Sequence, residues 1–284
     1  MLFRSILNKI FSRSTFRNCF DNGYDKTYSQ VVRRYVDNGT GKQNSELISQ
    51  IYNVLREGYR NEYYYKNTLL NKLLLGIHSV NTTTALTEIP IAKSKADFVL
   101  INGKAVVYEI KTELDNFDRL ENQINDYYKA FDHVAVVTCK ENLQVLKKKI
   151  EMIGKPVGIY ILQKRGTITT IQKPQAYSVE LDAEILFKIL RKQEYEEILF
   201  NKYKHLPDVS EFKYYSECKK MFLEIPLEEA YLSVLKLLKK RSQIIKDEFS
   251  KIPYELKFLA YFMNLKSDDY KKITKFLNES YGGV

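Results

Sequence analysis

Residues 95–111 read Lys95-Ala-Asp-Phe-Val-Leu-Ile-Asn-Gly-Lys-Ala-Val-Val-Tyr-Glu-Ile-Lys111. Two apolar runs flank Asn102-Gly103, a pair that is typical of a tight turn between antiparallel strands. Asp97 begins the first run, and Glu109 and Lys111 end the second. Glu109 and Lys111 are two residues apart, so on a strand their side chains point to the same face. Because charges are costly to bury without a purpose, we interpret this hairpin as holding a divalent metal and a water beside a phosphate.

The hydrophobic pattern around this hairpin predicts an α/β fold. Helices are expected at 45–58, 62–75, 117–131 and 141–153, and further strands at 85–91, 133–138, 157–162 and 167–171. The continuous apolar run at 133–138 is typical of a strand buried in parallel pairing. This order of elements predicts a mixed central sheet flanked by helices.

Composition divides the chain into three expected segments. They are a basic helical extension (1–43), the α/β core (44–174) and an all-helical domain for binding or interaction (175–284). Helices in the last segment are expected at 183–204, 208–222, 226–249, 253–264 and 267–280, with prolines at the breaks. That segment has no group of acid, His or Cys residues with catalytic spacing.

The overall charge favours a polyanionic partner, because 45 Lys and Arg residues oppose 35 Asp and Glu residues for a formal net charge of +10. The three cysteines are far apart and form no CxxC pair, which argues against a zinc knuckle or a disulfide framework and fits a reducing cytoplasm. No apolar run approaches the roughly 20 residues that span a bilayer. We therefore expect a cytoplasmic protein that binds nucleic acid and no membrane.

Phosphodiester cleavage needs an activated water and stabilisation of negative charge at phosphorus. A divalent cation held by carboxylates such as Asp97 and Glu109 supplies both. A neighbouring ammonium such as that of Lys111 orients the water and stabilises the developing charge. The backbone carbonyl of Ile110 is a further candidate ligand. An all-oxygen ligand set with no His or Cys nearby favours Mg²⁺.

These residues resemble the motif of the PD-(D/E)XK nuclease superfamily. Ala96-Asp97 followed by Glu109-Ile110-Lys111 matches it, except that Ala96 stands where the motif has proline. Gln123-Ile-Asn-Asp-Tyr127 looks like the QxxxY element of the RecB-like branch. Glu62 stands on a predicted helix before the core, where many members carry a carboxylate. Residues 45–173 are also similar to a family of small bacterial and phage-associated members, and the helical region after them is similar more weakly.

The resemblance implies a restriction-endonuclease-like core and a role for each matching residue. Asp97 and Glu109 would be metal ligands, with Glu62 as an additional carboxylate, and Mn²⁺ would substitute for Mg²⁺. Lys111 would position or activate water, and Gln123 would support the site. Three roles stay open for Tyr127, which would anchor its helix, contact phosphate or simply pack in the core. We do not expect Glu88, on the neighbouring strand, to take part.

A basic flank provides candidate contacts to nucleic acid. Residues 139–173 carry eight Lys or Arg against two Glu, whereas 109–132 carry seven acids against three bases. The candidates are Lys147, Lys148, Lys149, Lys164 and Arg165, together with Tyr127. An acidic pocket beside a basic surface suits a nuclease. The alternative for Lys147 to Lys149 is the solvated outer face of a helix.

The sequence therefore predicts a Mg²⁺-dependent nuclease that acts on DNA. The resemblance adds a phage-defence or mobile-element setting, and a homodimer or a protein partner is expected through the C-terminal helical domain. Two alternatives stay open. One is a module on a nuclease fold that binds nucleic acid or protein without cleavage, and the other is a regulated, toxin-like effector that cuts RNA.

Overall fold

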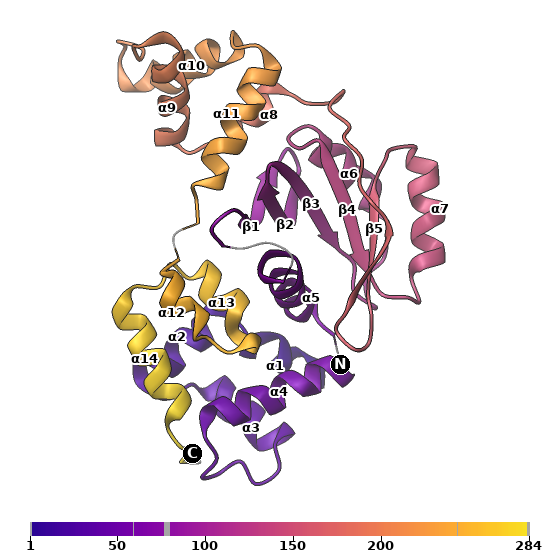
Figure 1. The fold of residues 1–284 in the computed structure, drawn as a ribbon, viewed down its shortest axis with the longest axis vertical. Helices are drawn as coiled ribbons and strands as arrows, with labels where there is room; N and C mark the ends of the chain where they lie inside the picture. The colour runs from indigo at the N-terminus through magenta and orange to yellow at the C-terminus, as the bar shows by residue number, and fades with distance from the viewer. Residues whose placement is uncertain (1, 59, 77–79, 243, 283–284) are drawn as a thin grey trace. The chain divides into compact units, whose positions relative to one another are not determined.

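The computed structural model describes residues 2–58, 60–76, 80–242 and 244–282. Contacts divide the chain into two compact units (Figure 1). The first comprises Met1–Val80, Gln163–Thr167 and Gln243–Val284, and the second comprises Asn81–Leu162 and Ile168–Ser242. Among the described residues, no helix is both long and apolar enough to cross a bilayer.

The second unit is built on a mixed sheet of six strands that lie side by side in chain order. The strands are β1 (Thr84–Ile91), β2 (Ser94–Asn102), β3 (Lys104–Ile110), β4 (His133–Thr138), β5 (Gly158–Leu162) and β6 (Ile168–Gln172). Pairing is antiparallel from β1 to β3, parallel from β3 to β5, and antiparallel again between β5 and β6. This arrangement confirms the predicted α/β class and mixed sheet.

The β2–β3 hairpin forms at the predicted turn. Gly103 has a φ of 72°, a left-handed conformation that favours glycine, and it joins the paired residues Asn102 and Lys104. Further along the hairpin, Phe98 pairs with Tyr108. One step beyond that pair, the register brings Asp97 opposite Glu109. The turn chemistry therefore sets which charged side chains meet.

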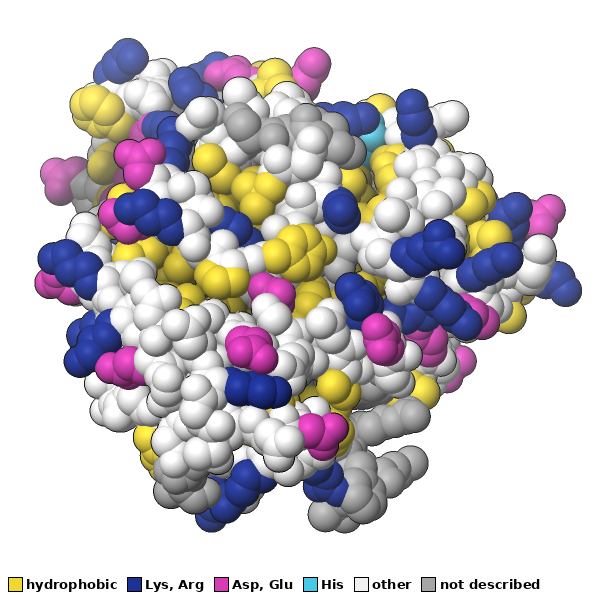
Figure 2. All heavy atoms as spheres, turned by 60° about the horizontal axis from the view of Figure 1, so that its bottom comes forward, with side chains coloured by type: hydrophobic (Ala, Val, Ile, Leu, Met, Phe, Trp, Pro, Cys, Tyr) yellow, Lys and Arg dark blue, Asp and Glu magenta, His cyan; other side chains and the backbone are white. Residues whose placement is uncertain are grey.

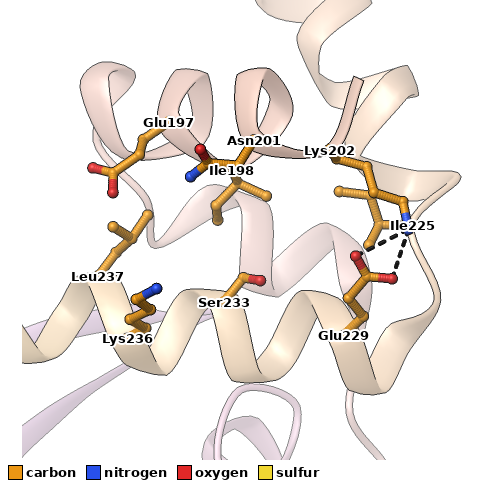
Figure 3. A pocket seen from close by; sticks show the side chains of 9 residues that line it. All are labelled: Glu197, Ile198, Asn201, Lys202, Ile225, Glu229, Ser233, Lys236 and Leu237. Carbon is orange, nitrogen blue, oxygen red and sulfur yellow. Dashed lines mark hydrogen bonds and ion pairs between the residues drawn. The ribbon is translucent and has the colours of Figure 1, made fainter. Parts of the chain in front are cut away.

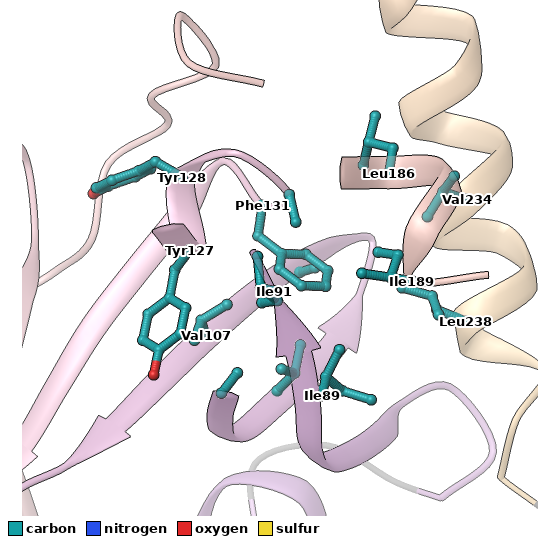
Figure 4. Close-up of a cluster of buried hydrophobic side chains, with 14 of the residues drawn as sticks. Ile89, Ile91, Val107, Tyr127, Tyr128, Phe131, Leu186, Ile189, Val234 and Leu238 are labelled. Carbon is teal, nitrogen blue, oxygen red and sulfur yellow. The ribbon is translucent and has the colours of Figure 1, made fainter. Parts of the chain in front are cut away.

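The second unit also holds helices α6 (Leu120–Tyr128), α7 (Leu143–Ile153), α8 (Ala183–Lys188), α9 (Lys192–Tyr203), α10 (Glu211–Leu223) and α11 (Leu227–Lys239). One hydrophobic core joins the sheet to several of these helices (Figure 4). Val107 of β3 and Phe131 after α6 belong to it, as do Leu186 of α8 and Val234 of α11. Helices α8 to α11 thus share a core with the sheet.

The first unit is helical and is built from both ends of the chain. Its elements are α1 (Leu2–Ile10), α2 (Arg13–Asn22), α3 (Lys26–Tyr35), α4 (Asn44–Gly58), α5 (Glu62–Leu69), the π-helix η1 (Leu70–Leu75), α12 (Lys246–Ser250), the 3₁₀ turn η2 (Tyr254–Leu256), α13 (Lys257–Phe262) and α14 (Ser267–Asn278). The buried amide of Asn44 connects the two ends, because it donates to the Phe276 carbonyl at 2.9 Å and accepts from the Tyr28 hydroxyl at 2.6 Å.

The boundaries of these two units differ from the domain boundaries predicted at 43/44 and 174/175. Residues 183–239 pack with the sheet, whereas the chain after residue 243 packs with α1 to α5. The reason is that the apolar faces of α8 and α11 find their partners on the sheet, and those of α13 and α14 find theirs on the N-terminal helices. The expectation of a separate all-helical domain over 175–284 is therefore corrected.

Asn67 of α5 provides a test of the first unit. Its side chain is fully buried and bonds the Tyr52 hydroxyl (2.9 Å), the Tyr254 carbonyl (3.0 Å) and the Phe258 amide (3.0 Å). We expect Asn67→Leu to lower the free energy of unfolding by about 2–4 kcal/mol, because buried partners lose their hydrogen bonds. Denaturant unfolding measures the change, and the exposed Asn53→Leu on α4 is the matched control. Equal stability of the two variants would contradict this description of the unit.

Candidate active site

Glu109 and Lys111 form a buried ion pair at the end of β3. The Lys111 Nζ lies 2.9 Å from Glu109 Oε1, and the two residues are 8% and 2% exposed. Gln123 of α6 bridges the pair, because its Oε1 accepts from Lys111 Nζ at 2.9 Å and its Nε2 donates to Glu109 Oε1 at 2.6 Å. These contacts confirm that Glu109 and Lys111 point to one face of the sheet. They also place Gln123 beside both residues.

Asp97 is fixed to the same end of the hairpin through the backbone. Its Oδ2 accepts the Ile110 amide at 2.8 Å, and its carbonyl accepts the Thr87 hydroxyl at 2.7 Å. The amide that Asp97 accepts belongs to the residue between Glu109 and Lys111. Asp97 is thus bonded to the backbone between Glu109 and Lys111, and the metal-binding and catalytic roles of these three residues stay predictions.

Tyr127 is fully buried and joins α6 to β2 and β3. Its hydroxyl donates to Glu109 Oε2 at 2.5 Å and lies 2.9 Å from the Lys95 carbonyl. Burial raises the pKa of Tyr127 far above its usual range, and the nearby Glu109 carboxylate adds to this effect. Of the three roles that the sequence leaves open, helix anchoring and core packing both match this geometry, because Tyr127 also belongs to the hydrophobic core. Contact with phosphate does not match, since the side chain has no exposed surface.

Removal of this hydroxyl is expected to destabilise the second unit. Tyr127→Phe leaves Glu109 Oε2 without its hydrogen bond, so we expect unfolding to become easier by about 1–3 kcal/mol. Thermal or denaturant unfolding measures the loss. Tyr215→Phe on α10 is the control, since that side chain is half-exposed and its ring contacts Phe187 and Tyr195, outside this network. A Tyr127→Phe protein as stable as the control would show that the bond contributes nothing.

Asp126 holds the other side of α6 to the start of β2. Its Oδ2 accepts the Ser94 hydroxyl at 2.8 Å and the Lys93 amide at 3.2 Å. Burial alone would raise the pKa of Asp126, but hydrogen bonds from Ser94 and Lys129 outweigh burial and lower it. Together with Tyr127, this carboxylate sets how α6 presents Gln123 to the site.

The lowered pKa of Asp126 predicts a pH dependence of stability. A carboxyl whose pKa is lower in the folded state stabilises the fold above its unfolded pKa, near about 3.9, and loses that contribution as pH falls through the folded pKa. We therefore expect Asp126→Asn to be less stable than wild type at neutral pH and to lose less stability on acidification below about pH 4. Unfolding curves across pH test this, with the exposed Asp118→Asn as control. Parallel pH profiles for wild type and Asp126→Asn would contradict it.

Glu88 lies beside Asp97, contrary to expectation. The pairs Thr87–Phe98 and Ile89–Ala96 leave Glu88 directly across from Asp97. Carboxylate oxygens of the two residues lie within 4.8 Å of each other, although Glu88 also pairs with Lys95 Nζ at 2.9 Å. Glu88 has a φ of 57°, which is uncommon for a residue other than glycine. The β1–β2 register that places Glu88 there is a feature of the structure, because the sequence pattern predicts no pairing for β1.

Glu62 belongs to the first unit and stands in the first turn of α5, where the sequence places it. Its carboxylate is 58% exposed and pairs with the largely buried Lys66 at 2.5 Å. Asn61 caps the helix by accepting the Tyr64 amide at 3.0 Å. The predicted role of Glu62 as a metal carboxylate stays a prediction.

The basic candidates divide between the two units. Lys147 and Lys148 are exposed on α7, and Lys149 is half-buried on the same helix. Lys164 and Arg165 are exposed in the turn between β5 and β6, which belongs to the first unit. Lys and Arg side chains are spread over the face in Figure 2, with Asp and Glu side chains among them. Nucleic-acid contact by these five residues stays a prediction.

Comparisons with known proteins place the chain in a family. Protein cII of Enterobacteria phage P4 is 24% identical over 143 residues, which are 49% of each protein, so the chain spans about half the length of this curated relative. No solved structure is a significant match. The family model described as bacteriophage P4 protein cII matches residues 56–258, well over half of the chain. The chain therefore belongs to the bacteriophage P4 protein cII family.

Proposed function

We propose that this protein hydrolyses phosphodiester bonds in nucleic acid, DNA in preference to RNA, with Mg²⁺ as its metal and a restriction-endonuclease-like core. One observation carries the proposal. The Ile110 amide donates to Asp97, while Glu109 and Lys111 on either side of it form a buried ion pair. An antiparallel hairpin that passes into parallel strands β3 to β5 positions these groups.

The donor atoms of the site suit a hard cation. Carboxylate oxygens of Asp97 and Glu88 lie within 4.8 Å of each other, and these residues would hold the metal together with Glu109 and the Ile110 carbonyl. Oxygen-only ligands fit Mg²⁺, with Mn²⁺ as a substitute. A bound ion of this kind lowers the pKa of water and stabilises charge on a phosphoryl group.

Lys111 supplies the positive charge that the protein itself brings to the reaction. Glu109 and Gln123 fix its ammonium from two sides, so it loses little freedom when it donates to water or to a phosphoryl oxygen. Both oxygens of Glu109 already accept hydrogen bonds from Lys111, Gln123 and Tyr127. Metal binding through Oε1 therefore requires the Lys111 or Gln123 side chain to shift, whereas Oε2 keeps a second lone pair beside the Tyr127 hydroxyl.

The net charge of the chain and its phage relative support the biological setting that we propose. The net charge of +10 supports a polyanionic partner. The matched relative is a phage protein, which supports a mobile-element or phage-defence role in the cytoplasm. The proposal includes a homodimer or a protein partner, and it includes no binding to a membrane.

Incubation with plasmid DNA, single-stranded DNA and RNA tests the proposal. We expect cleavage of DNA with millimolar Mg²⁺ or Mn²⁺ and none with EDTA. A folded protein that cuts none of these substrates with either metal would overturn the proposal. Cleavage of RNA alone would instead identify the regulated effector.

A second candidate function is binding of nucleic acid without cleavage. The observation that favours it is that Lys111 already balances the charge of Glu109, while Gln123 and Tyr127 also donate to its carboxylate, all without a metal. DNA binding that weakens steeply with salt, together with no cleavage under either metal, is the result that would select this function.

A further inference from the structure

A pocket lies between α9 and α11 in the second unit (Figure 3). Its volume is about 370 Å³, and Ile198, Ile225 and Leu237 supply its apolar lining. None of its lining residues belongs to the candidate active site. The pocket therefore has room for a small molecule or for one side chain of a partner, and its use is independent of cleavage.

Both carboxylates that line the pocket are already neutralised. Lys202 Nζ donates to the two oxygens of Glu229 at 2.9 and 2.7 Å, which ties α9 to α11 at one end of the pocket. Glu197 accepts from Lys240 Nζ at 2.7 Å. These two ion pairs leave no unpaired acid to attract a cation into the pocket.

Three polar side chains of the pocket have no partner among the residues that the structure describes. They are the amide of Asn201, the hydroxyl of Ser233 and the ammonium of Lys236, none of which forms a hydrogen bond or ion pair there. Figure 3 shows Ser233 and Lys236 on the α11 side, with Asn201 on the α9 side. Three hydrogen-bonding side chains thus line a largely polar pocket, to which Ile198, Ile225 and Leu237 add a smaller apolar part.

We propose that this pocket binds a carboxylate that carries a short apolar chain. Lys236 supplies the opposite charge, and Ser233 and Asn201 supply neutral donors. Ile198 and Leu237 accommodate the carbon chain. A phosphate dianion fits less well, because among the lining residues only Lys236 offers an unpaired positive charge, which balances one negative charge and not two. The carboxylate comes from a free small molecule or from an acidic side chain of a peptide.

Titration of the full chain, followed by amide chemical shifts, tests the proposal. The probes are sodium butyrate, a capped pentapeptide with a single central glutamate, and inorganic phosphate. We expect saturable shifts at Asn201 and Ser233 with millimolar affinity for at least one carboxylate probe. Chemical-shift changes with butyrate would show that a free carboxylate is sufficient for binding to the pocket. Changes with the peptide alone would show that the ligand is an acidic side chain of a peptide. No saturable shift with either, or tighter binding of phosphate, would overturn the proposal.

A pair of exposed lysines on α11 gives matched variants. Lys236→Met is expected to weaken carboxylate binding about tenfold, because the charged hydrogen bond is lost. Lys239→Met, one turn further along the helix and outside the pocket, is expected to leave binding unchanged. Both lysines are exposed, so both variants are expected to fold. Equal affinity of Lys236→Met and wild type would overturn the assignment.

Discussion

Asp97→Asn is expected to abolish metal-dependent DNA cleavage while the fold stays intact. The asparagine oxygen still accepts the Ile110 amide, so the hairpin keeps the bond that positions it. Under the proposed function, the lost negative charge removes a metal ligand. We expect the cleavage rate to fall by more than about 100-fold, because changes in residues that only support metal ligands already lower activity about 10–100-fold. Initial rates of plasmid cleavage across Mg²⁺ concentrations measure the effect.

The matched control is Asp118→Asn, which changes an exposed aspartate in the loop before α6. It is expected to cleave at the wild-type rate, because it alters net charge by the same amount outside the site. Wild-type cleavage by both variants would remove Asp97 from the mechanism. Loss of cleavage in both would point to overall charge and not to a ligand.

Lys111→Met is expected to damage both stability and activity. Glu109 is 2% exposed, so removal of its cationic partner leaves a buried charge uncompensated, at a cost of about 3–5 kcal/mol. Activity is expected to fall by about 100-fold or more, because the ammonium that stabilises developing charge is gone. Amide hydrogen exchange along β3 and β4 measures stability locally, which suits a chain with two units.

The double change Lys111→Met with Glu109→Gln separates these two effects. A neutral pair of similar volume removes the uncompensated charge, so stability is expected to recover most of the loss. Activity is expected to stay absent, because a ligand and the ammonium are both missing. Recovery of cleavage in the double variant would contradict the assigned roles, and an unchanged stability of Lys111→Met would contradict the buried ion pair.

Local chemistry made much of the sheet and of the candidate site predictable. Asn102-Gly103 specifies the turn, and the two-residue period of a strand puts Glu109 and Lys111 on one face. Gln123 and Tyr127 share a face of α6 because they are four residues apart. The approach of Glu88 to Asp97 was not predictable, because it depends on strand pairing and on a φ of 57° that no residue type announces; a role for Glu88 in metal binding stays untested.

Long-range packing made the rest unpredictable from the sequence. Asn44 and Phe276 are 232 residues apart, so no local pattern reveals that both ends build one unit. The helix expected at 226–249 is interrupted instead between Lys239 and Lys246, where Arg241 forms a two-pronged ion pair with Glu194 of α9. Residues 239–243 carry no apolar side chain, so the apolar periodicity also breaks there.

The helix expected from residue 117 begins at Leu120 for a more local reason. Thr112 donates to the Asp115 carboxylate through both its amide and its hydroxyl, each at 2.7 Å. The Asp115 side chain thus closes a turn before the helix. Residues 112–119 therefore form a loop directly after Lys111.

The most direct test of the metal site is the anomalous signal of Mn²⁺ in a crystal of the protein soaked with that ion. The account predicts a peak bound by oxygens of Asp97 and Glu109, with the Glu109 carboxylate released from Lys111 or Gln123. An absent peak at Asp97, with Glu109 still bonded to Lys111, Gln123 and Tyr127, would contradict a metal-dependent nuclease.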